Sequence, residues 1–386
     1  MANVASFHEL LKPLIVYSKI IGVEIWTAPG KFVPASYYLS AAVVIYVIST
    51  ASTVFKYRND LLYIMKVLVT LGTGVQLFFK FFVGHAKAYD VKLLTEKIEL
   101  EVLERFQKGT TEEIAVLDRT GRYLWIIIRT IRLACLSTVA GFALYPLFAY
   151  FTTGAIVPLL LVELPFIDCN TTTGYILNAL FQLNLLLYGV AGIVLADFMY
   201  AMCAIYAMAA ADIFILHLVE LESMLNDPVH DNTNRSEIRE IWLQCMYDHQ
   251  LGKCLLNDAE DIFGLLCLAQ VTMGVFTLCD CLLLVVLTDW YPTYCFFLVM
   301  FTELTFYFVV GNIVELKIDE VYNKITSMPW YRLPVKEQKE FCFLMARQQR
   351  PMMFTAYGFH PMNFEAFMSV LRGLYQFFVM IMQYFG

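Results

Sequence analysis

The sequence predicts an all-α membrane protein with seven transmembrane helices, an N-terminus in the cytoplasm and a C-terminus outside the cell. Hydrophobic residues make up 59% of the 386 residues, and the mean hydropathy of +0.63 is far above that of soluble globular proteins. Seven apolar runs are long enough to cross a hydrocarbon core of ~30 Å. The basic residues gather in alternate connections between these runs, as expected for a multi-pass protein.

The seven runs differ in how completely they exclude charge. Three contain no charged residue: Phe32–Phe55, Leu133–Val162 and Cys169–Ala196. Three contain a single charge: Ile262–Thr288 with Asp280, Trp290–Val314 with Glu303, and Ala366–Gly386 with Arg372. The remaining run, Leu61–Val83, contains Lys66 and Lys80. Each of these lysines lies near an end of the run, from which a lysine side chain can reach the interface.

The segments outside the spans suggest how the rest of the chain is organised. Residues 1–34 lack the apolar core of a secretory signal, and their spaced leucines and isoleucines predict an amphipathic or re-entrant segment. Residues 35–314 hold spans one to six, 315–353 form a cytoplasmic anchor, and 354–386 contain the last helix. Val91–Leu103 and Ile238–Phe263 carry apolar residues at helical spacing among charges, so we expect helices to extend into the anchor region. Solvated amphipathic hairpins are the alternative.

The orientation follows from the distribution of lysine and arginine. Of the 27 basic residues, 22 lie in residues 1–34, 84–132, 212–261 and 315–353, whereas only Lys56 and Arg58 lie in the opposite connections. Basic residues favour the cytoplasmic side of a membrane, so the N-terminus is cytoplasmic and seven crossings leave the C-terminus outside. This topology is the inverse of a G-protein-coupled receptor. Asp118-Arg119, which resembles part of a receptor motif, also precedes the third span instead of closing it.

The sequence shows no catalytic centre. His85 and Asp90 have a spacing found in membrane acyltransferases, but no glycine-rich acyl-donor block follows them. The chain has no glycine-rich nucleotide motif and no His-Glu-x-x-His metal motif, and its ten cysteines show no metal spacing. We therefore expect no enzymatic activity, no metal, no cofactor and no nucleic-acid partner.

One modification site is expected on the outer side. Asn170-Thr171-Thr172 is a glycosylation sequon in the connection between spans three and four. A second match at Asn234 falls on the cytoplasmic side and is expected to stay unmodified. Cys169 and Cys295 are the cysteines most open to an oxidising exterior, and nothing in the sequence pairs them.

Polar and aromatic residues in spans two, three, four and six predict a ligand pocket. In the outward half of span three, Thr138, Gly141 and Tyr145 share one helical face, which combines a hydroxyl, an exposed backbone and an aromatic wall. A concave, mostly apolar pocket with a few polar groups suits a small hydrophobic ligand. Ordinary packing by small and aromatic residues is the alternative at each position. The expected set is Thr70, Thr73, Gly74, Thr138, Gly141, Phe142, Tyr145, Phe181, Gln182, Leu185, Tyr188, Phe297, Leu298 and Phe301.

The last helix carries two different faces although it ends within the membrane. One face is formed by polar, small and mid-sized apolar residues: Ser369, Arg372, Gly373, Gln376, Val379, Met380 and Gln383. The opposite face is formed by large apolar residues: Leu371, Leu374, Phe378, Ile381 and Phe385. A membrane helix with a polar stripe faces something other than lipid. Water in a pore is the first candidate.

Acidic residues on the outer side fit a path for cations. Asp60, Glu163, Asp168, Asp280 and Asp289 outnumber the two basic residues there, and acidic groups at a pore mouth concentrate cations. Simple solvation of loop carboxylates is the alternative. Glu303 lies deep inside span six, where a charge is costly, and is therefore a functional candidate.

The chain resembles the insect odorant receptors. Gly311-Asn312, Trp330-Tyr331 and Arg347-Gln348-Gln349-Arg350-Pro351 are similar to the run into that family's last helix, and Gly358, Phe364, Phe367, Leu371-Arg372 and Tyr375 resemble its terminal signature. Tyr175, Gln182 and Asp197 match its spacing in span four. The chain departs from the family at Leu374-Tyr375-Gln376-Phe377 and at Thr326. The related gustatory receptors rank second, because Leu374 and Tyr384 interrupt their typical ending.

The resemblance implies a subunit of a ligand-gated, non-selective cation channel at the cell surface of olfactory neurons. Such a subunit binds a small volatile and joins an odorant receptor coreceptor in a heteromeric tetramer. By this likeness the last helix lines the pore, with Gln376, Val379, Met380 and Gln383 as pore or gate residues and Met380 and Gln383 at the gate positions. A multi-pass transporter is a further alternative, and it would require paired ionisable groups near the middle of the bilayer.

Overall fold

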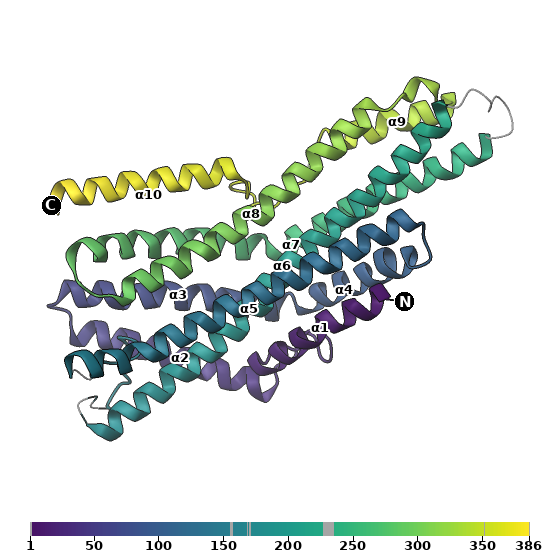
Figure 1. Cartoon of the computed structure of the whole chain (residues 1–386). Coiled ribbons are helices and arrows are strands. Elements are labelled where there is room, and N and C mark those ends of the chain that lie inside the picture. The colour runs from purple at the N-terminus through teal and green to yellow at the C-terminus, as the bar shows by residue number, and fades with distance from the viewer. Residues whose placement is uncertain are drawn as a thin grey trace.

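A computed structural model describes residues 2–154, 157–167, 169, 171–226, 235–350 and 352–385, and the elements in these ranges are helical (Figure 1). In chain order they are α1 (Ala2–Ile21), α2 (Pro34–Lys56), α3 (Leu61–Ala86), α4 (Ala88–Ile98), the π-helical turn η1 (Glu99–Glu104), α5 (Thr111–Thr153), α6 (Thr172–Asn226), α7 (Arg235–Leu287), α8 (Pro292–Ser327), the 3₁₀ turn η2 (Trp330–Arg332), α9 (Val335–Gln348) and α10 (Phe364–Phe385).

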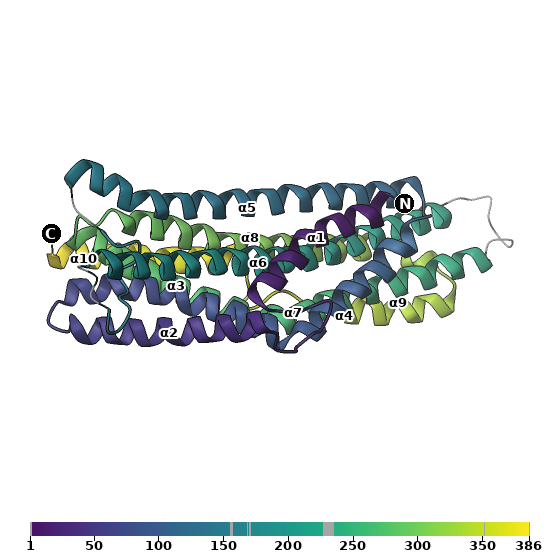
Figure 2. The same cartoon turned by 90° about the horizontal axis from the view of Figure 1, so that it is seen from below.

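Seven helices in the described part of the chain are long and apolar enough to cross a membrane: α2, α3, α5, α6, α7, α8 and α10. This confirms the seven spans expected from the sequence. The helix α6 has 55 residues and is therefore about 80 Å long at 1.5 Å per residue, far more than the hydrocarbon core requires. The helices α5, α6, α7 and α8 thus continue beyond the membrane, as predicted. Their extensions run side by side at the end of the molecule where the N-terminus is marked (Figure 2).

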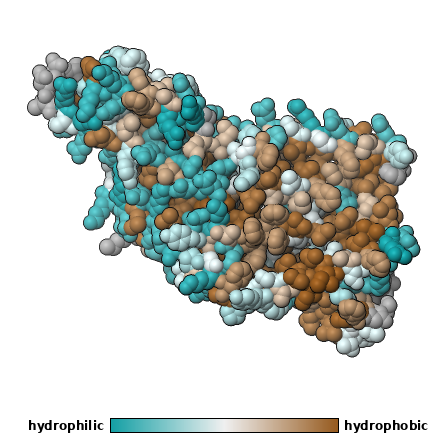
Figure 3. Space-filling view, turned by 180° about the vertical axis from the view of Figure 1, so that it is seen from behind, coloured by the Kyte–Doolittle hydropathy of each residue, from teal (hydrophilic) through white to brown (hydrophobic). Residues whose placement is uncertain are grey.

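The surface reflects this division into two parts. The part built from the membrane-crossing halves of the helices is largely hydrophobic, whereas the part around the helix extensions is largely hydrophilic (Figure 3). Apolar side chains such as Ile126 and Leu144 are about 60% exposed (61% and 59%) on the membrane part. Surface of this kind is stable only against lipid or another subunit.

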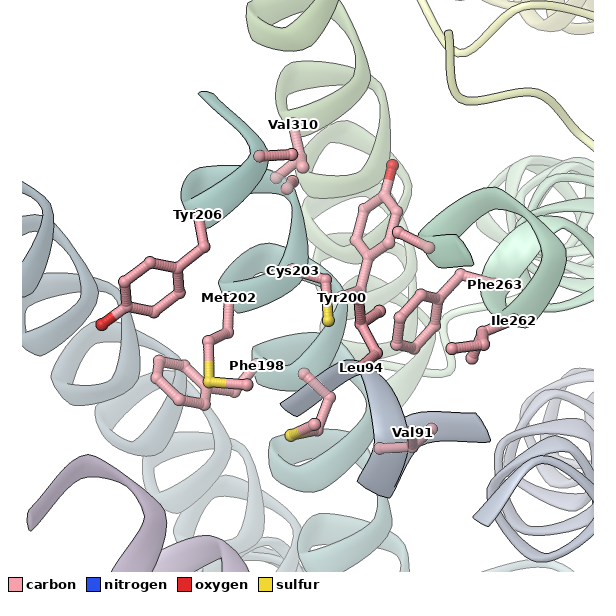
Figure 4. Close-up of a cluster of buried hydrophobic side chains, with 14 of the residues drawn as sticks. Val91, Leu94, Phe198, Tyr200, Met202, Cys203, Tyr206, Ile262, Phe263 and Val310 are labelled. Atoms are coloured by element: carbon pink, nitrogen blue, oxygen red, sulfur yellow. The ribbon is translucent and has the colours of Figure 1, made fainter. Parts of the chain in front are cut away.

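The main core surrounds the middle of α6. Five consecutive residues, from Phe198 to Met202, are all buried, so this stretch of α6 contacts other helices on every side. Figure 4 shows part of the cluster, in which Val91 and Leu94 of α4, Phe263 of α7 and Val310 of α8 surround α6. The α6 helix is therefore the central element around which the others pack.

A second core lies in the extensions. It contains Phe214 and Leu218 of α6, Trp242 of α7, and Val321 and other residues of the chain that follows. Its remaining buried members are Leu221, Cys245, Ile325, Met328, Leu333, Phe341 and Leu344. The predicted anchor segment 315–353 supplies about half of this cluster, and the ends of α6 and α7 supply the rest.

The first helix is amphipathic. Phe7, Leu10 and Leu14 of α1 are fully buried against the bundle, while its other face is exposed. The turn after α1 approaches α2 closely: a Cβ atom on Gly22 (φ +73°) would lie 2.2 Å from the backbone nitrogen of Ser36. Only glycine fits this left-handed and crowded position. The Ser36 hydroxyl donates a hydrogen bond to the Gly22 carbonyl and so fixes the junction.

Local capping explains where α5 begins and ends. Thr110 and Glu113 form a capping box at its start. The helix ends at Thr153 because Gly154 adopts a left-handed conformation (φ +68°), which closes the last turn. The sequence-based span Leu133–Val162 therefore ends too late, and residues 157–162 belong to a loop.

The approach to α10 depends on a glycine in α8. A Cβ atom on Gly311 would lie 2.0 Å from the carbonyl oxygen of Met362, so the chain before α10 passes directly over this position. The neighbouring Asn312 accepts a hydrogen bond from the backbone N–H of Phe364 (3.1 Å) and caps the new helix. Gly311 and Asn312 thus determine where α10 starts relative to α8.

We expect the substitution Gly311→Ala to destabilise the protein by roughly 1–3 kcal/mol, because backbone atoms cannot move aside as a flexible side chain can. Thermal unfolding of the purified protein measures the effect. Gly141→Ala in α5 is the matched control, since nothing lies within 4 Å of its Cβ position. An equal loss of stability in the two variants would contradict the proposed crowding.

Candidate functional site: an apolar cavity and the last helix

An apolar cavity lies within the membrane part of the bundle, between α2, α3, α5, α6 and α8. Its volume, taken as the space that the centre of a water molecule can reach, is about 170 Å³. Seven residues of the predicted pocket line it: Thr70, Thr73, Gly74, Thr138, Phe142, Leu185 and Tyr188. Spans two, three and four therefore contribute to the cavity through positions that the sequence had marked.

The other seven residues of the predicted pocket lie outside the lining: Gly141, Tyr145, Phe181, Gln182, Phe297, Leu298 and Phe301. Gly141 and Leu298 are exposed on the membrane surface of the protein. Phe301 and Phe297 stack on each other (6.0 Å between ring centroids), and Phe301 also meets Phe367 of α10. Gln182 is buried and holds a loop, as described below.

The cavity also has two groups of lining residues that the sequence did not predict. Leu39, Val43 and Tyr46 form one face of α2, at spacings of four and three residues. On α8 the lining residues are Phe296, Val299 and Met300, one step away from the predicted Phe297 and Leu298. The spacing in α2 is visible in the sequence. In contrast, the choice between neighbouring phenylalanines depends on the rotation of α8, which sequence alone does not define.

The polar groups of the cavity differ in their availability. The hydroxyls of Thr70, Thr73 and Thr138 donate to backbone carbonyls of their own helices, and that of Tyr46 donates to the Thr70 carbonyl (2.8 Å). These oxygens can still accept a hydrogen bond but cannot donate one. Tyr188 makes no hydrogen bond to any described residue and packs against the ring of Tyr38 at 5.7 Å. Its hydroxyl is therefore the clearest donor to a ligand.

A loop closes the outer end of the cavity. Leu160 lines the cavity, and both of its backbone groups bond to the side chain of Gln182. Its N–H donates to the amide oxygen (2.8 Å), and its carbonyl accepts from the amide nitrogen (2.9 Å). The same loop is fastened to α2, where Thr53 binds the backbone of Glu163 and Lys56 pairs with its carboxylate (2.5 Å). We call residues 157–167 the outer loop. It is held by side chains of α2, α3 and α6.

Two of the acidic residues predicted for the outer side have structural partners. Glu163 is bound by Lys56 and by the Tyr57 hydroxyl, and Asp60 caps α3 by accepting from the backbone of Tyr63. Asp280 is buried in α7 with 8% of its surface exposed. Asp168 and the predicted glycosylation site Asn170 lie outside the described residues. A ring of free carboxylates at an outer mouth is thus not seen in the described part.

A buried ion cluster connects three helices beside the cavity. Lys80 of α3 contacts Asp197 of α6 at 2.7 Å and Glu303 of α8 at 3.3 Å, and the lysine side chain is 1% exposed. The Tyr307 hydroxyl also donates to Asp197 (2.7 Å), and Gln270 of α7 donates to Glu303 (2.8 Å). This cluster identifies the partner of Glu303. It joins α3, α6, α7 and α8, and the attraction between its charges is stronger in the low-dielectric interior than it would be in water.

The last helix presents its two faces as the sequence pattern indicated. Leu374 and Ile381 of the large apolar face are buried, and Leu371 and Phe378 are half-buried. On the opposite stripe Ser369, Arg372, Gly373, Gln376, Met380 and Gln383 are exposed and Val379 is half-buried. The polar stripe of α10 therefore faces away from the subunit's own core and is free to face another subunit or water.

The helix α8 contacts both the cavity and α10. Phe296, Val299 and Met300 line the cavity, whereas Phe301 and Phe308 on another face meet Phe367 of α10 at 6.3 and 5.2 Å between ring centroids. Glu303 lies between these groups and belongs to the ion cluster. A movement of α8 that follows occupation of the cavity would therefore reach α10 directly.

The fold and the cavity define an all-helical, multi-pass membrane protein with room for a small apolar molecule. Residues 60–375 match the family model described as 7tm odorant receptor, and the chain therefore belongs to this family. It is an odorant receptor subunit and not an enzyme.

Two known proteins illustrate the likeness. The putative odorant receptor 83c of Drosophila melanogaster is 28% identical over 91 residues, which is 24% of this chain and 23% of that protein, so the similarity spans about a quarter of its length. The olfactory receptor OR5 of Machilis hrabei has a similar fold, with a TM-score of 0.74 over 99% of both chains at 11% identity. This holds for its structure with eugenol and for its structure without.

We expect Lys80→Met to destabilise the protein by about 3–5 kcal/mol, because the change leaves Asp197 and Glu303 buried without their cation. Thermal unfolding in detergent is the measurement. Lys87→Met serves as control, since Lys87 forms a surface pair with Asp90 in which both side chains are more than 40% exposed (41% and 48%). A Lys80 variant as stable as the control would show that the cluster contributes nothing to stability.

Proposed function

We propose that this odorant receptor subunit forms part of a ligand-gated, non-selective cation channel in the plasma membrane of olfactory neurons. A small volatile binds in the apolar cavity, and α10 lines the pore in a heteromeric tetramer with an odorant receptor coreceptor. The observation that carries the proposal is the position of α8, which forms a wall of the cavity and also contacts α10. Membership of the odorant receptor family supports the ligand class.

The lining of the cavity indicates the chemistry of the ligand. Most of it is aliphatic or aromatic, and the threonine and tyrosine hydroxyls supply a few polar groups. A ligand of this kind is small and largely apolar and carries one acceptor that meets Tyr188, or one donor that meets a threonine oxygen. The likeness to a receptor whose structure holds eugenol supports such a volatile.

Gating follows from the two contacts of α8. A ligand that prefers one packing of α8 shifts the equilibrium by the difference between its affinities for the two packings. Phe301 and Phe308 carry the change to Phe367, so α10 moves relative to its copies in the neighbouring subunits. Met380 then withdraws from the pore axis, and Gln383 offers polar groups to the hydrated ions.

Two alternatives have observations of their own. A gustatory-receptor-type channel would share the fold and differ in ligand, so a panel of soluble tastants separates it from the proposal. A multi-pass transporter is favoured by the cluster of Lys80, Asp197 and Glu303, because transporters use paired ionisable groups inside the membrane. Uptake of a labelled ligand without conductance would support the transporter. Ligand-evoked current without uptake supports the channel.

We expect Tyr188→Phe to weaken the response to volatiles that carry a hydrogen-bond acceptor by roughly three- to tenfold, the worth of one hydrogen bond. The response to pure hydrocarbons should stay within twofold. Dose–response curves from patch-clamp recording of cells that also express the coreceptor give the values. Tyr145→Phe is the matched control, because Tyr145 lies outside the cavity lining. Equal shifts in both variants would contradict the assignment.

We expect Met380→Ala and Gln383→Ala to alter the current through the channel, because both residues occupy the exposed stripe of α10. Met380→Ala should raise the current in the absence of ligand, and Gln383→Ala should change the ratio of sodium to calcium permeability. Met382→Ala is the control, since Met382 lies two residues along the helix and points to another side. Unaltered permeation and gating in both test variants would refute the pore assignment.

A further inference from the structure

Three arginines lie on the exposed face of α5, near the point where this helix enters the membrane from the cytoplasm. Arg122, Arg129 and Arg132 are exposed, and Arg122, Arg129 and Leu133 recur at spacings that place them along one side of the helix. Trp125 (45% exposed) and Ile126 (61% exposed) lie between them on the same side. We call these five residues, Arg122, Trp125, Ile126, Arg129 and Arg132, the arginine face.

The charges of the arginine face are not neutralised by the protein. None of its three arginines forms an ion pair with a carboxylate in the part of the chain that the structure describes, whereas Arg119, one turn earlier, pairs with Asp212 at 2.7 Å. An arginine beside exposed isoleucine and tryptophan is costly unless its charge meets a phosphate or water. The partner must therefore come from outside this subunit.

The depth of the arginine face corresponds to the lipid headgroups of the inner leaflet. Tryptophan is enriched where the hydrocarbon meets the headgroups, which places Trp125 at that boundary. Side chains in a helix lean toward its N-terminus, and α5 begins in the cytoplasm, so the long side chains of Arg129 and Arg132 extend from the hydrocarbon toward the cytoplasmic surface. Arg122, Arg129 and Arg132 follow one another over about 15 Å of α5 at 1.5 Å per residue, so three positive charges lie along this boundary.

A groove adjoins this layer between α1, α5 and α6. It offers about 180 Å³ to the centres of water-sized molecules and is lined by Arg122 and Trp125 of the arginine face and by Asp118, Ser6 and Tyr206. Tyr206 is 2% exposed, yet its hydroxyl has no hydrogen-bond partner among the described residues. Its ring points away from the other labelled side chains of the core in Figure 4. The groove therefore combines a cation, an anion and an unused hydroxyl.

We propose that the arginine face and this groove bind an anionic phospholipid of the inner leaflet, and that phosphatidylserine is the headgroup that fits. Its phosphodiester meets Arg122 at the groove, because a guanidinium binds phosphate oxygens well through its planar donors, and Arg129 and Arg132 add positive charge along the same face. Its ammonium group meets Asp118 in the groove, and its carboxylate accepts from Tyr206. A lipid bound here lies between α1 and α5 and so links the N-terminal helix to the bundle.

The test uses the full chain, purified in detergent and freed of lipid. Native mass spectrometry then measures retention of phosphatidylcholine, phosphatidylserine and phosphatidylglycerol with equal acyl chains. We expect phosphatidylserine to be retained most strongly. The triple variant Arg122→Gln, Arg129→Gln, Arg132→Gln should lose about a hundredfold in affinity, since each basic residue at an anionic membrane contributes about fivefold. Asp118→Asn should abolish the preference for phosphatidylserine over phosphatidylglycerol.

Two further variants serve as controls. The triple variant Arg122→Lys, Arg129→Lys, Arg132→Lys keeps the charge and should retain most of the binding. The triple variant Lys108→Gln, Lys336→Gln, Lys339→Gln removes three exposed cations outside the arginine face and should leave retention unchanged. The proposal is overturned if the arginine variant binds phosphatidylserine like the wild type, or if the distant control loses as much. It also fails if an assembled tetramer excludes added lipid from this face because a second copy covers it.

Discussion

The ion cluster around Lys80 determines how the membrane part of this odorant receptor subunit is assembled. One lysine meets carboxylates from α6 and α8 at 2.7 and 3.3 Å, and a tyrosine and a glutamine complete their hydrogen bonds. A buried charge is tolerated only with its partners in place, so the mutual positions of α3, α6 and α8 are narrowly defined. The cavity is enclosed by these same helices together with α2 and α5, and its shape therefore depends on the cluster.

In the proposed mechanism, ligand recognition and transmission to α10 use different faces of the single helix α8. Met300 lines the cavity, the next residue Phe301 turns toward α10, and Glu303 is held by Lys80. A rigid helix with three different neighbours within one turn cannot move against one of them without affecting the others. The chain that enters α10 also lies close to α8, because a Cβ atom on Gly311 of α8 would be 2.0 Å from the carbonyl oxygen of Met362.

Much of this fold could be read from the sequence, and the reasons for the failures are physical. Nearly uncharged runs located the spans, because lipid tolerates few charges and little exposed backbone, and the asymmetry of basic residues predicts their orientation. The two faces of α10 followed from its periodicity. The cavity was predicted only in part. For example, Phe296 lines it in place of the predicted Phe297, because the rotation of α8 decides which of the two faces the cavity. The partners of Glu303 come from Lys80 and Gln270, more than 30 residues away in the chain, and no local pattern connects such positions.

For the proposed binding of a volatile in the cavity, the attachment of the outer loop bears on the route by which the volatile enters. Gln182, Thr53 and Lys56 hold this loop at the outer end of the cavity, while the lining residue Phe78 of α3 is 44% exposed on the membrane part of the surface. An odorant that arrives through the bilayer is presented at its membrane concentration, which for apolar molecules exceeds the aqueous one by orders of magnitude. The partition coefficient of the volatile then contributes to sensitivity as much as its fit, and modest intrinsic affinity suffices.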